Sequence, residues 1–394
     1  MSNIQLIIEE RAADIGNFLV GRLLPFRQKR AVGPFVFIDH MGPAELKDYQ
    51  NLDVPPHPHI GLSTLTYLFE GAIFHRDSLG TAMEIQPGAV NWMTAGKGVV
   101  HSERTPDYLR TTDKKLHGLQ IWVGLPKELE QSEPSFHHIE ASDIPSWEDN
   151  SIQIKLIAGE AFGKTSPVPV HSALYFLELK SGNGQMVSIG KDLYGESALY
   201  ILEGSIKNDG HQYGPKQILI AKDSTLCAFE MEANTTVYIF GGTPFPEERF
   251  IHWNFVSSNK NILEQAKINW SVQNLEAFPK VPGDNAEFVP LPIYDKPKVV
   301  VSFIREELDK KGTFTIFENG IPAGEMTYVW AGKHKFIIDH TETFEKFSGK
   351  GYGKQLVLKG VAYAKSKGVK ILPLCPYAKR VMEQDESLHE MIFR

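Results

Sequence analysis

The stretches HPHIGLSTLTYLFEG (57–71) and NWMTAGKGVVHSE (91–103) decide the fold that this sequence predicts. Each combines β-branched and aromatic residues with Gly or Pro, which is typical of short strands joined by tight turns. LHGLQIWVGLP (116–126) predicts a further strand, and HRDSLG (75–80) predicts a turn. Short strands with turn signals at intervals of about eight to twelve residues indicate a β-sandwich or a β-barrel.

Four potential metal ligands lie at the two ends of this region. His57 and His59 are two positions apart, as are His101 and Glu103. Because alternate side chains of a strand share one face, each pair points to one side of its strand. Three imidazoles and one carboxylate from neighbouring strands form a ligand set for a divalent transition metal, with open positions for substrate. Surface histidines in a turn are the simpler alternative, but the matching spacing favours a metal site. Fe(II) suits these donors best, with Mn, Ni, Cu and Zn as alternatives.

Three other residues of this region have less specific roles. Pro58 cannot donate a ladder hydrogen bond, so it favours an edge strand or a bulge. Trp92 and Met93 either line an apolar pocket or belong to the core. An imidazole ligand also needs a hydrogen-bond partner that fixes its tautomer, and the sequence does not identify that partner.

The strand pattern recurs in the middle of the chain. TYLFEGAI (66–73) resembles LYILEGSI (199–206), and IWVGLP (121–126) resembles IFGGTP (239–244). The polar segment 126–150 predicts a crossover linker between the copies. We therefore expect a duplicated β-barrel.

The second copy lacks the candidate ligands. Gly190 and Asp192 stand where the first copy has its HxH pair, and the segment 226–228 corresponds to HSE. None of these positions is a histidine, so the second barrel is expected to have a structural role.

Length and composition limit the functional classes. The chain has 394 residues, too many for one hydrophobic core, and a formal net charge of −7. Proteins that bind nucleic acid neutralise its phosphates with clustered basic residues. A mildly acidic protein with scattered basic residues is therefore not expected to bind nucleic acid. No signal peptide or apolar run of about 18 residues is recognisable. Cys227 and Cys375 form no disulfide framework. We expect a cytoplasmic monomer without a nucleic-acid or membrane partner.

The strand pattern ends before the C-terminal third. Residues 257–278 carry apolar residues at helical spacing behind an Asn or Ser cap and predict a helix. A proline-rich connection follows at 278–298. From residue 299 the sequence predicts an α/β domain, with a hairpin at Asn319-Gly320 and a helix within 349–368. Further elements are predicted as strands at 335–342 and 370–375 and a helical C-terminal end.

The stretches 57–71, 75–80 and 91–103, with FVFIDHMGP (35–43) and EFVPLP (287–292), resemble the signature segments of the pirin family. Pirins are bicupins, so the resemblance implies two β-barrels over about residues 1–292, with the metal in the first. It implies four ligands that are the same as those found from spacing: His57, His59, His101 and Glu103. Many other cupins have a ligand glutamate where this chain has Ser63, so the carboxylate is expected from Glu103.

The pirin resemblance implies two kinds of activity. Some pirins resemble quercetin 2,3-dioxygenases, in which about two of six metal positions remain for O₂ or for the 3-hydroxyl and 4-carbonyl oxygens of a flavonol. The metal acidifies the hydroxyl, Glu103 accepts its proton, and O₂ cleaves the heterocycle with release of carbon monoxide and a depside. The substrate class is then a flavonol or a similar aromatic diphenol. The alternative is a redox-sensing regulatory or binding protein that holds metal without turnover.

The C-terminal segments FENGIPAGEMTYVW (317–330), FIIDHTETFEKFSGKGYGKQLV (336–357) and KILPLCPYAK (370–379) resemble small GNAT acetyltransferase domains. In GNAT enzymes a glycine-rich turn opens a helix whose free N–H groups bind the pyrophosphate of coenzyme A. Ser348 replaces the usual Arg or Gln at the start of this motif. The residues to which this role carries over are Gly349, Lys350, Gly351, Tyr352 and Gly353.

Three polar residues near the GNAT-like motif are weaker candidates for chemistry. His340 and Glu342 are candidate bases. Cys375 is either an acyl acceptor or a small core residue, and the core role is favoured because buried free cysteine is common.

The sequence thus predicts a mainly β protein, with two cupin-type β-barrels (a bicupin) followed by a small α/β GNAT-like domain. The expected boundaries are 1–130 for the metal-binding barrel, 131–292 for the second barrel and 297–394 for the GNAT-like domain. Fe(II) or a similar metal and acetyl-CoA are the expected cofactors.

Overall fold

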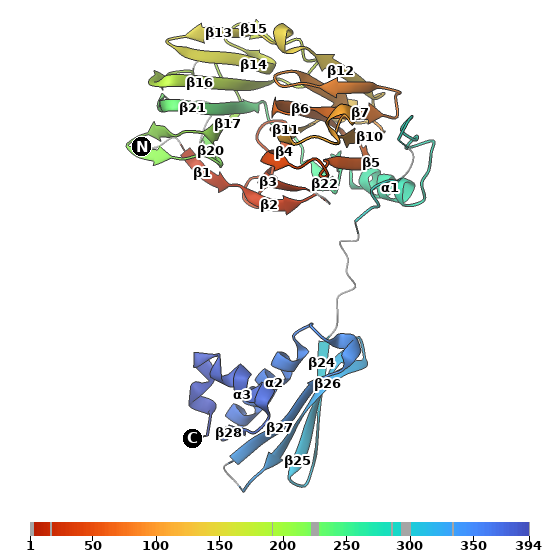
Figure 1. The fold of residues 1–394 in the computed structure, drawn as a ribbon, viewed down its shortest axis with the longest axis vertical. Coiled ribbons are helices and arrows are strands. Elements are labelled where there is room, and N and C mark those ends of the chain that lie inside the picture. The colour runs from red at the N-terminus through yellow and green to blue at the C-terminus, as the bar shows by residue number, and fades with distance from the viewer. Residues whose placement is uncertain are drawn as a thin grey trace. The chain divides into compact units, whose positions relative to one another are not determined.

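The computed structural model describes residues 4–15, 18–190, 192–221, 228–284, 287–292, 301–332 and 335–393. The chain forms two compact units, Met1–Pro292 and Ile293–Arg394. The first unit contains the β-barrels and the second an α/β domain (Figure 1). This architecture confirms the predicted fold class, while the predicted boundary between the two barrels stays a prediction.

The N-terminal barrel is built from two antiparallel sheets. Their strand orders are β12-β9-β6-β11-β4-β3-β2 and β5-β10-β7-β8. The strand β5 pairs only with β10 in its sheet, and this edge position accommodates Pro58 as predicted. The strands are β2 (Arg11–Asp14), β3 (Leu19–Leu24), β4 (Phe35–Leu46), β5 (Asp53–His59), β6 (Leu62–Glu70), β7 (Ile73–Asp77), β8 (Ala82–Ile85), β9 (Val90–Thr94), β10 (Val99–Arg104), β11 (Lys114–Gly124) and β12 (Ser135–Ile139).

The second barrel is built on one large sheet, in the order β1-β20-β17-β21-β16-β14-β13, with three short strands beside it. The repeated segments occupy equivalent places, since β6 pairs with β11 as β17 pairs with β21. The strands are β1 (Ile4–Glu9), β13 (Ser146–Asp149), β14 (Ile152–Ala161), β15 (Lys164–Thr165), β16 (Leu174–Val187), β17 (Glu196–Glu203), β18 (Ile206–Asn208), β19 (His211–Tyr213), β20 (Gln217–Ala221) and β21 (Phe229–Gly242).

A shared apolar core joins the two barrels. Side chains of β6, β9 and β11 pack in one cluster with side chains of β16, β17 and β21. Phe35 contributes its ring to this cluster, with centroid distances of 5.3 Å to Phe240 and 6.3 Å to Phe176. Trp92 belongs to the same cluster and is 1% exposed, so it is a core residue rather than a pocket lining.

The chain ends of this unit cross between the barrels. The first strand, β1, pairs with β20 of the second barrel. After β21 the chain returns to the first barrel through β22 (Phe250–His252), β23 (Phe255–Ser257) and the helix α1 (Lys260–Ser271). The Asn259 side chain accepts a hydrogen bond from the N–H of Asn261, which provides the predicted helix cap. Further on, the N–H of Val289 donates to the carbonyl of Pro56, so this segment lies against the strand that carries the HxH pair.

Two local predictions were wrong. The polar segment 126–150 is not only a linker, because β12 extends the sheet of the first barrel and β13 that of the second. The predicted turn at 75–80 begins later, because β7 runs through Asp77. The strands β12 and β13 are rich in polar residues and lie at sheet edges, so their sequences lack the apolar alternation that identifies a half-buried strand.

The second unit is a five-stranded sheet, ordered β24-β25-β26-β27-β28, in which only β27 and β28 are parallel. The hairpin turns at Asn319 and Gly320, which both have positive φ, as the Asn-Gly pair predicted. The elements are β24 (Val301–Leu308), β25 (Lys311–Glu318), β26 (Ile321–Trp330), β27 (Lys335–Thr343), α2 (Tyr352–Ser366), β28 (Lys370–Pro373), α3 (Pro376–Glu383) and a 3₁₀ segment at Glu386–Met391.

None of the helices in the described part of the chain combines the length and apolar character needed to cross a bilayer.

Candidate metal centre

Three histidine side chains converge between the two sheets of the N-terminal barrel. His57 and His59 come from β5 and His101 from β10, where His101 lies directly opposite His57. One ring nitrogen of each lies within 4.8 Å of the others. All three side chains are buried. The two-residue spacing in an edge strand and the pairing of β5 with β10 therefore bring together the three histidines that the sequence singled out.

The arrangement of these nitrogens fits a metal ion. The Nε2 atoms of His59 and His101 are 3.1 Å apart. Two nitrogens that each lie about 2.1 Å from one ion and about 90° apart are themselves about 3.0 Å apart. The Nδ1–H of His57 donates to the carbonyl of Pro55 at 2.9 Å, which leaves the Nε2 of a neutral His57 ring without a proton. These are the neutral donors that a divalent metal requires.

Burial keeps the three imidazoles neutral. It lowers the pKa of His57 to about 4 and lowers the pKa of His59 and of His101 well below the usual value. The positive charge that each ring would carry also disfavours protonation of its neighbours. A cluster of unprotonated, buried nitrogens is costly without a partner, so the donor set favours a bound cation.

Glu103 lies on the same strand face as His101 but outside the group of three nitrogens within 4.8 Å. Its carboxylate accepts a long hydrogen bond of 3.5 Å from the Thr66 hydroxyl of the facing sheet. Burial raises the pKa of Glu103, and the hydrogen bond from the Thr66 hydroxyl partly opposes this change. The role of Glu103 as a fourth ligand or proton acceptor stays a prediction.

Two buried residues beside the cluster were missed in the sequence, His75 and Asp77. The Nε2 of His75 is 2.9 Å from Oδ2 of Asp77, and its Nδ1 is 3.5 Å from Nδ1 of His101. Both residues point inward from β7. The alternation Ile73-Phe-His-Arg-Asp77 was the available signal, but two polar residues at inward positions resemble a turn when their partners are unknown.

The second barrel offers no comparable cluster among its described residues. Gly190 and Asp192 lie in a turn region before β17. Residues 222–227, which include Leu226 and Cys227, lie outside the described part of the chain.

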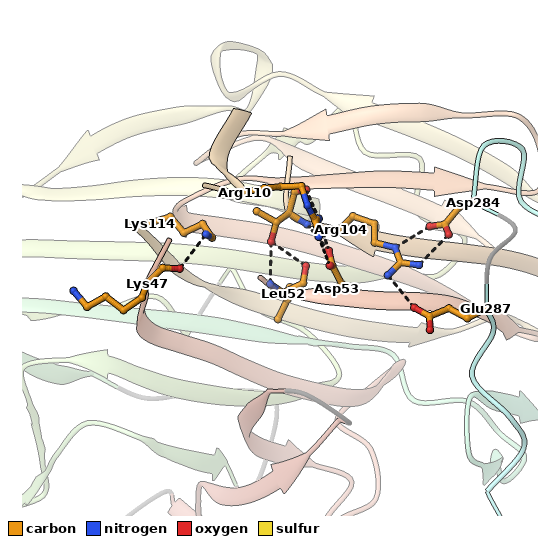
Figure 2. A network of polar contacts seen from close by, with 9 residues as sticks. Lys47, Leu52, Asp53, Arg104, Arg110, Lys114, Asp284 and Glu287 are labelled. Atoms are coloured by element: carbon orange, nitrogen blue, oxygen red, sulfur yellow. Dashed lines mark hydrogen bonds and ion pairs between the residues drawn. The ribbon is translucent and has the colours of Figure 1, made fainter. Parts of the chain in front are cut away.

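Arginine–carboxylate pairs hold β5 and β10, the two strands that carry the three histidines (Figure 2). Arg104, next to Glu103, donates two 2.9 Å hydrogen bonds to Asp284 of the returning segment. Arg110 donates two hydrogen bonds to Asp53 at the start of β5, at 3.0 and 2.8 Å. These pairs border an outer cavity of about 500 Å³, which no cluster histidine lines. Bidentate geometry fixes both partners, so the ends of β5 and β10 are braced on the face opposite the histidines.

Acid is expected to destabilise the metal-free protein. Burial lowers the pKa of both His57 and His117 to about 4, below the value of about 6.5 in an unfolded chain. The unfolded state therefore binds protons below about pH 6.5 while the folded state does not. The free energy of unfolding should fall between about pH 6.5 and 4, by up to about 1.4 kcal/mol per pH unit for each histidine. Urea unfolding at pH 7.5 and pH 5 with a chelator measures this effect, and equal midpoints would contradict it.

The glycine-rich motif of the second unit lies at the start of a helix. Gly351 is the residue before α2, has φ of +76° and provides no side-chain cap. Lys350 contacts the Glu318 carboxylate at 2.8 Å, and the Tyr352 hydroxyl donates to the same carboxylate. These contacts hold the motif against the end of β25. The first N–H groups of α2 have no capping side chain, because Gly351 occupies the N-cap position.

The other candidates of this unit differ in exposure. His340 and Glu342 lie on β27 with exposed side chains, and Nε2 of His340 is 3.6 Å from Oε2 of Glu342. Cys375 is buried within the apolar core of the unit, and its N–H donates to the carbonyl of Ile338. A buried thiol among apolar side chains fits the structural role that the sequence favoured.

Comparisons with known proteins agree with these features. The family model described as Pirin matches residues 17–123, and the Pirin C-terminal cupin domain matches residues 176–276. A model described as GCN5-related N-acetyl-transferase matches residues 313–391.

Similar proteins cover the first unit. A pirin-like protein of Caulobacter vibrioides is 45% identical over 293 residues, which are 73% of this chain and 99% of the relative. A Pseudomonas aeruginosa protein that bears the provisional name quercetin 2,3-dioxygenase PA1205 is 35% identical over 67% of this chain and 82% of its own length. The crystal structure of a quercetin 2,3-dioxygenase from Acinetobacter baumannii matches with a TM-score of 0.67 and 32% identity, covering 74% of this chain and 96% of that chain. The chain therefore belongs to the pirin family, with two cupin domains, and its residues 313–391 match the GCN5-related N-acetyl-transferase model.

Proposed function

We propose that the N-terminal barrel is a metal-dependent dioxygenase of the quercetin 2,3-dioxygenase type, which uses O₂ to cleave a flavonol or a similar aromatic diphenol. The observation that carries this proposal is the convergence of three buried imidazole nitrogens from β5 and β10. The relatives named for this activity support the substrate class. Fe(II) is the proposed metal, with Mn, Ni, Cu and Zn as alternatives.

The side chains of the site have separate roles in this proposal. His57, His59 and His101 hold the metal, with Glu103 as a fourth ligand. When bound, the metal acidifies a substrate hydroxyl. Glu103, beside the cluster and buried, accepts the hydroxyl proton. Met93 and Val99 form a buried apolar cluster with Phe136, whose ring stacks on His75, and this cluster excludes water from the reaction.

The test compares metal-stripped protein with protein reloaded with each metal. We expect metal-dependent O₂ consumption and loss of quercetin absorbance in the reloaded protein, and no loss of absorbance under anaerobic conditions. Turnover that continues unchanged in the stripped protein would reject the proposed mechanism. Metal binding without turnover of quercetin or of other flavonols would favour the alternative, a metal-dependent redox-sensing regulatory protein.

We also propose that the second unit binds acetyl-CoA through Gly349, Lys350, Gly351, Tyr352 and Gly353. The match of residues 313–391 to the GCN5-related model supports this proposal. The uncapped N-terminus of α2 supplies the N–H groups for the pyrophosphate.

Gly351→Ala is expected to weaken coenzyme A binding by roughly tenfold, because a Cβ at the helix N-terminus hinders the approach of a phosphate to the backbone. Gly368→Ala is the matched control. Both glycines have positive φ and no atom within 4 Å of an added Cβ, so each substitution should cost about 1–2 kcal/mol of stability. Isothermal titration with coenzyme A measures the difference. Equal affinities of the two variants would contradict the proposed site.

A further inference from the structure

A line of buried side chains ends at the three-histidine site. It consists of Asp77, His75 and His101. In the pairing of β10 with β7, His101 lies opposite Asp77, and the next inward pair is Glu103 and His75. The chain of contacts runs from Oδ2 of Asp77 to Nε2 of His75 at 2.9 Å, and from Nδ1 of His75 to Nδ1 of His101 at 3.5 Å. The distance between the two Nδ1 atoms is at the upper limit for a hydrogen bond.

The carboxylate of Asp77 is built as a fixed acceptor. Its side chain is fully buried, and Oδ1 accepts hydrogen bonds from the N–H groups of Leu79 and Thr81 at 2.9 and 3.0 Å. The remaining oxygen, Oδ2, faces His75. Because the oxygens of a carboxylate accept hydrogen bonds, this contact assigns a proton to Nε2 of His75.

This assignment determines the next nitrogen. When Nε2 carries the only proton of the His75 ring, Nδ1 can only accept a hydrogen bond. The atom facing it is Nδ1 of His101, which is therefore the donor. His101 then has its single proton on Nδ1, and its Nε2 is the unprotonated nitrogen 3.1 Å from Nε2 of His59. The ring of Phe136 stacks on His75 with centroids 4.6 Å apart and restrains the ring orientation.

We propose that Asp77 and His75 are positioning residues that fix the tautomer of His101, so that its unprotonated Nε2 faces the metal. This inference rests on the proposed metal-binding role of the three histidines. In His57 the acceptor is a backbone carbonyl: Nδ1–H donates to the carbonyl of Pro55, which leaves Nε2 to face the site. Metal-bound histidines commonly donate their second N–H to a carboxylate or carbonyl. Here the carboxylate acts through an intervening imidazole.

The substitution Asp77→Asn tests the tautomer directly. The amide that it introduces can donate to Nε2 of His75, which moves the proton of His75 to Nδ1. His75 then donates to His101, and the proton of His101 moves to Nε2, where it blocks coordination. We expect Co(II) affinity, measured by competition with a chromophoric chelator, to fall by roughly 10–100-fold, with a changed visible Co(II) spectrum.

Asp39→Asn is the matched control. Asp39 is another buried carboxylate of the same barrel, and its partner is Arg22 rather than a histidine. This variant should bind Co(II) with wild-type affinity and spectrum. Thermal unfolding of the metal-free proteins reports whether each variant is folded.

Substitutions at His75 provide an independent test. In His75→Asn the amide oxygen takes the place of Nδ1 as an acceptor for His101, so Co(II) affinity should stay within about threefold of wild type. In His75→Phe the ring is kept but the acceptor is lost, so affinity should fall as in Asp77→Asn. Adding Asp77→Asn to His75→Asn should cause no further loss, because the proton can no longer be passed to His101. If Asp77→Asn does not fold, the His75 pair decides the question.

Two results would overturn the inference: wild-type Co(II) affinity and spectrum in both Asp77→Asn and His75→Phe, or an equal loss of affinity in Asp39→Asn. Failure of the proposed function gives a different result. If wild-type protein binds no Co(II), the metal site itself is refuted, and this inference with it. If it binds Co(II) but no metal supports quercetin turnover, only the dioxygenase proposal fails.

Discussion

His101→Ala is expected to abolish quercetin turnover and to lower metal affinity by more than the roughly 10–100-fold typical of residues that only orient a ligand. His101 is the proposed histidine ligand from β10 and lies opposite His57. Its Nε2 atom is 3.1 Å from the Nε2 atom of His59. Its removal leaves His57, His59 and the proposed ligand Glu103. The ion then loses a directly bonded nitrogen, and not only a hydrogen-bond partner that orients a ligand. Metal content after dialysis and O₂ consumption with quercetin are the measurements.

His137→Ala is the control for this variant. His137 is an exposed histidine of β12 and faces away from the cluster, so metal content and turnover should stay at wild-type levels. Circular dichroism of both variants shows whether the barrel is intact. Turnover in His101→Ala at the wild-type rate, with the same metal content, would remove the catalytic proposal.

Phe35→Ala is expected to lower the free energy of unfolding of the barrel unit by about 3–5 kcal/mol. Phe35 is fully buried, and its ring contacts the rings of Phe176 and Phe240 of the second barrel. Truncation leaves a cavity in the core that both barrels share, and strands on both sides lose packing contacts. Urea unfolding, followed by hydrogen exchange of peptides from β16 and β21, measures the loss within this unit.

Met186→Ala is the matched control, because Met186 lies on β16 but is 58% exposed. Its substitution should change stability by no more than about 0.5 kcal/mol. If Phe35→Ala has an equally small effect, or loosens only the first barrel, the two barrels do not share one cooperative core.

Much of the candidate site followed from local sequence rules. Side chains alternate along any strand, so the spacing of His57 and His59 and of His101 and Glu103 placed each pair on one face before any partner was known. Pro58 similarly indicated an edge strand, because the missing N–H is a property of the residue itself. The repeated segments that became β6 and β17 revealed the duplication.

Other features depended on partners distant in sequence. His75 and Asp77 resembled turn residues because polar side chains can occupy inward positions only when each has a buried partner. The sequence does not show that the Asp77 carboxylate receives two backbone N–H groups and an imidazole. The polar strands β12 and β13 were missed for the same reason. Backbone pairing with β9 and β14 holds them in extended conformation, although their amino-acid composition does not favour a strand.

The sequence by itself determined the fold class, the family resemblance and the three histidines, because strand alternation, turn residues and residue chemistry act over a few neighbouring positions. Only the tertiary structure decided which nitrogens meet, which side chains contact His101, and that β1 and the segment after β21 cross between the barrels. These features arise from hydrogen bonds and packing between segments far apart in the chain, where geometry rather than residue type selects the partner.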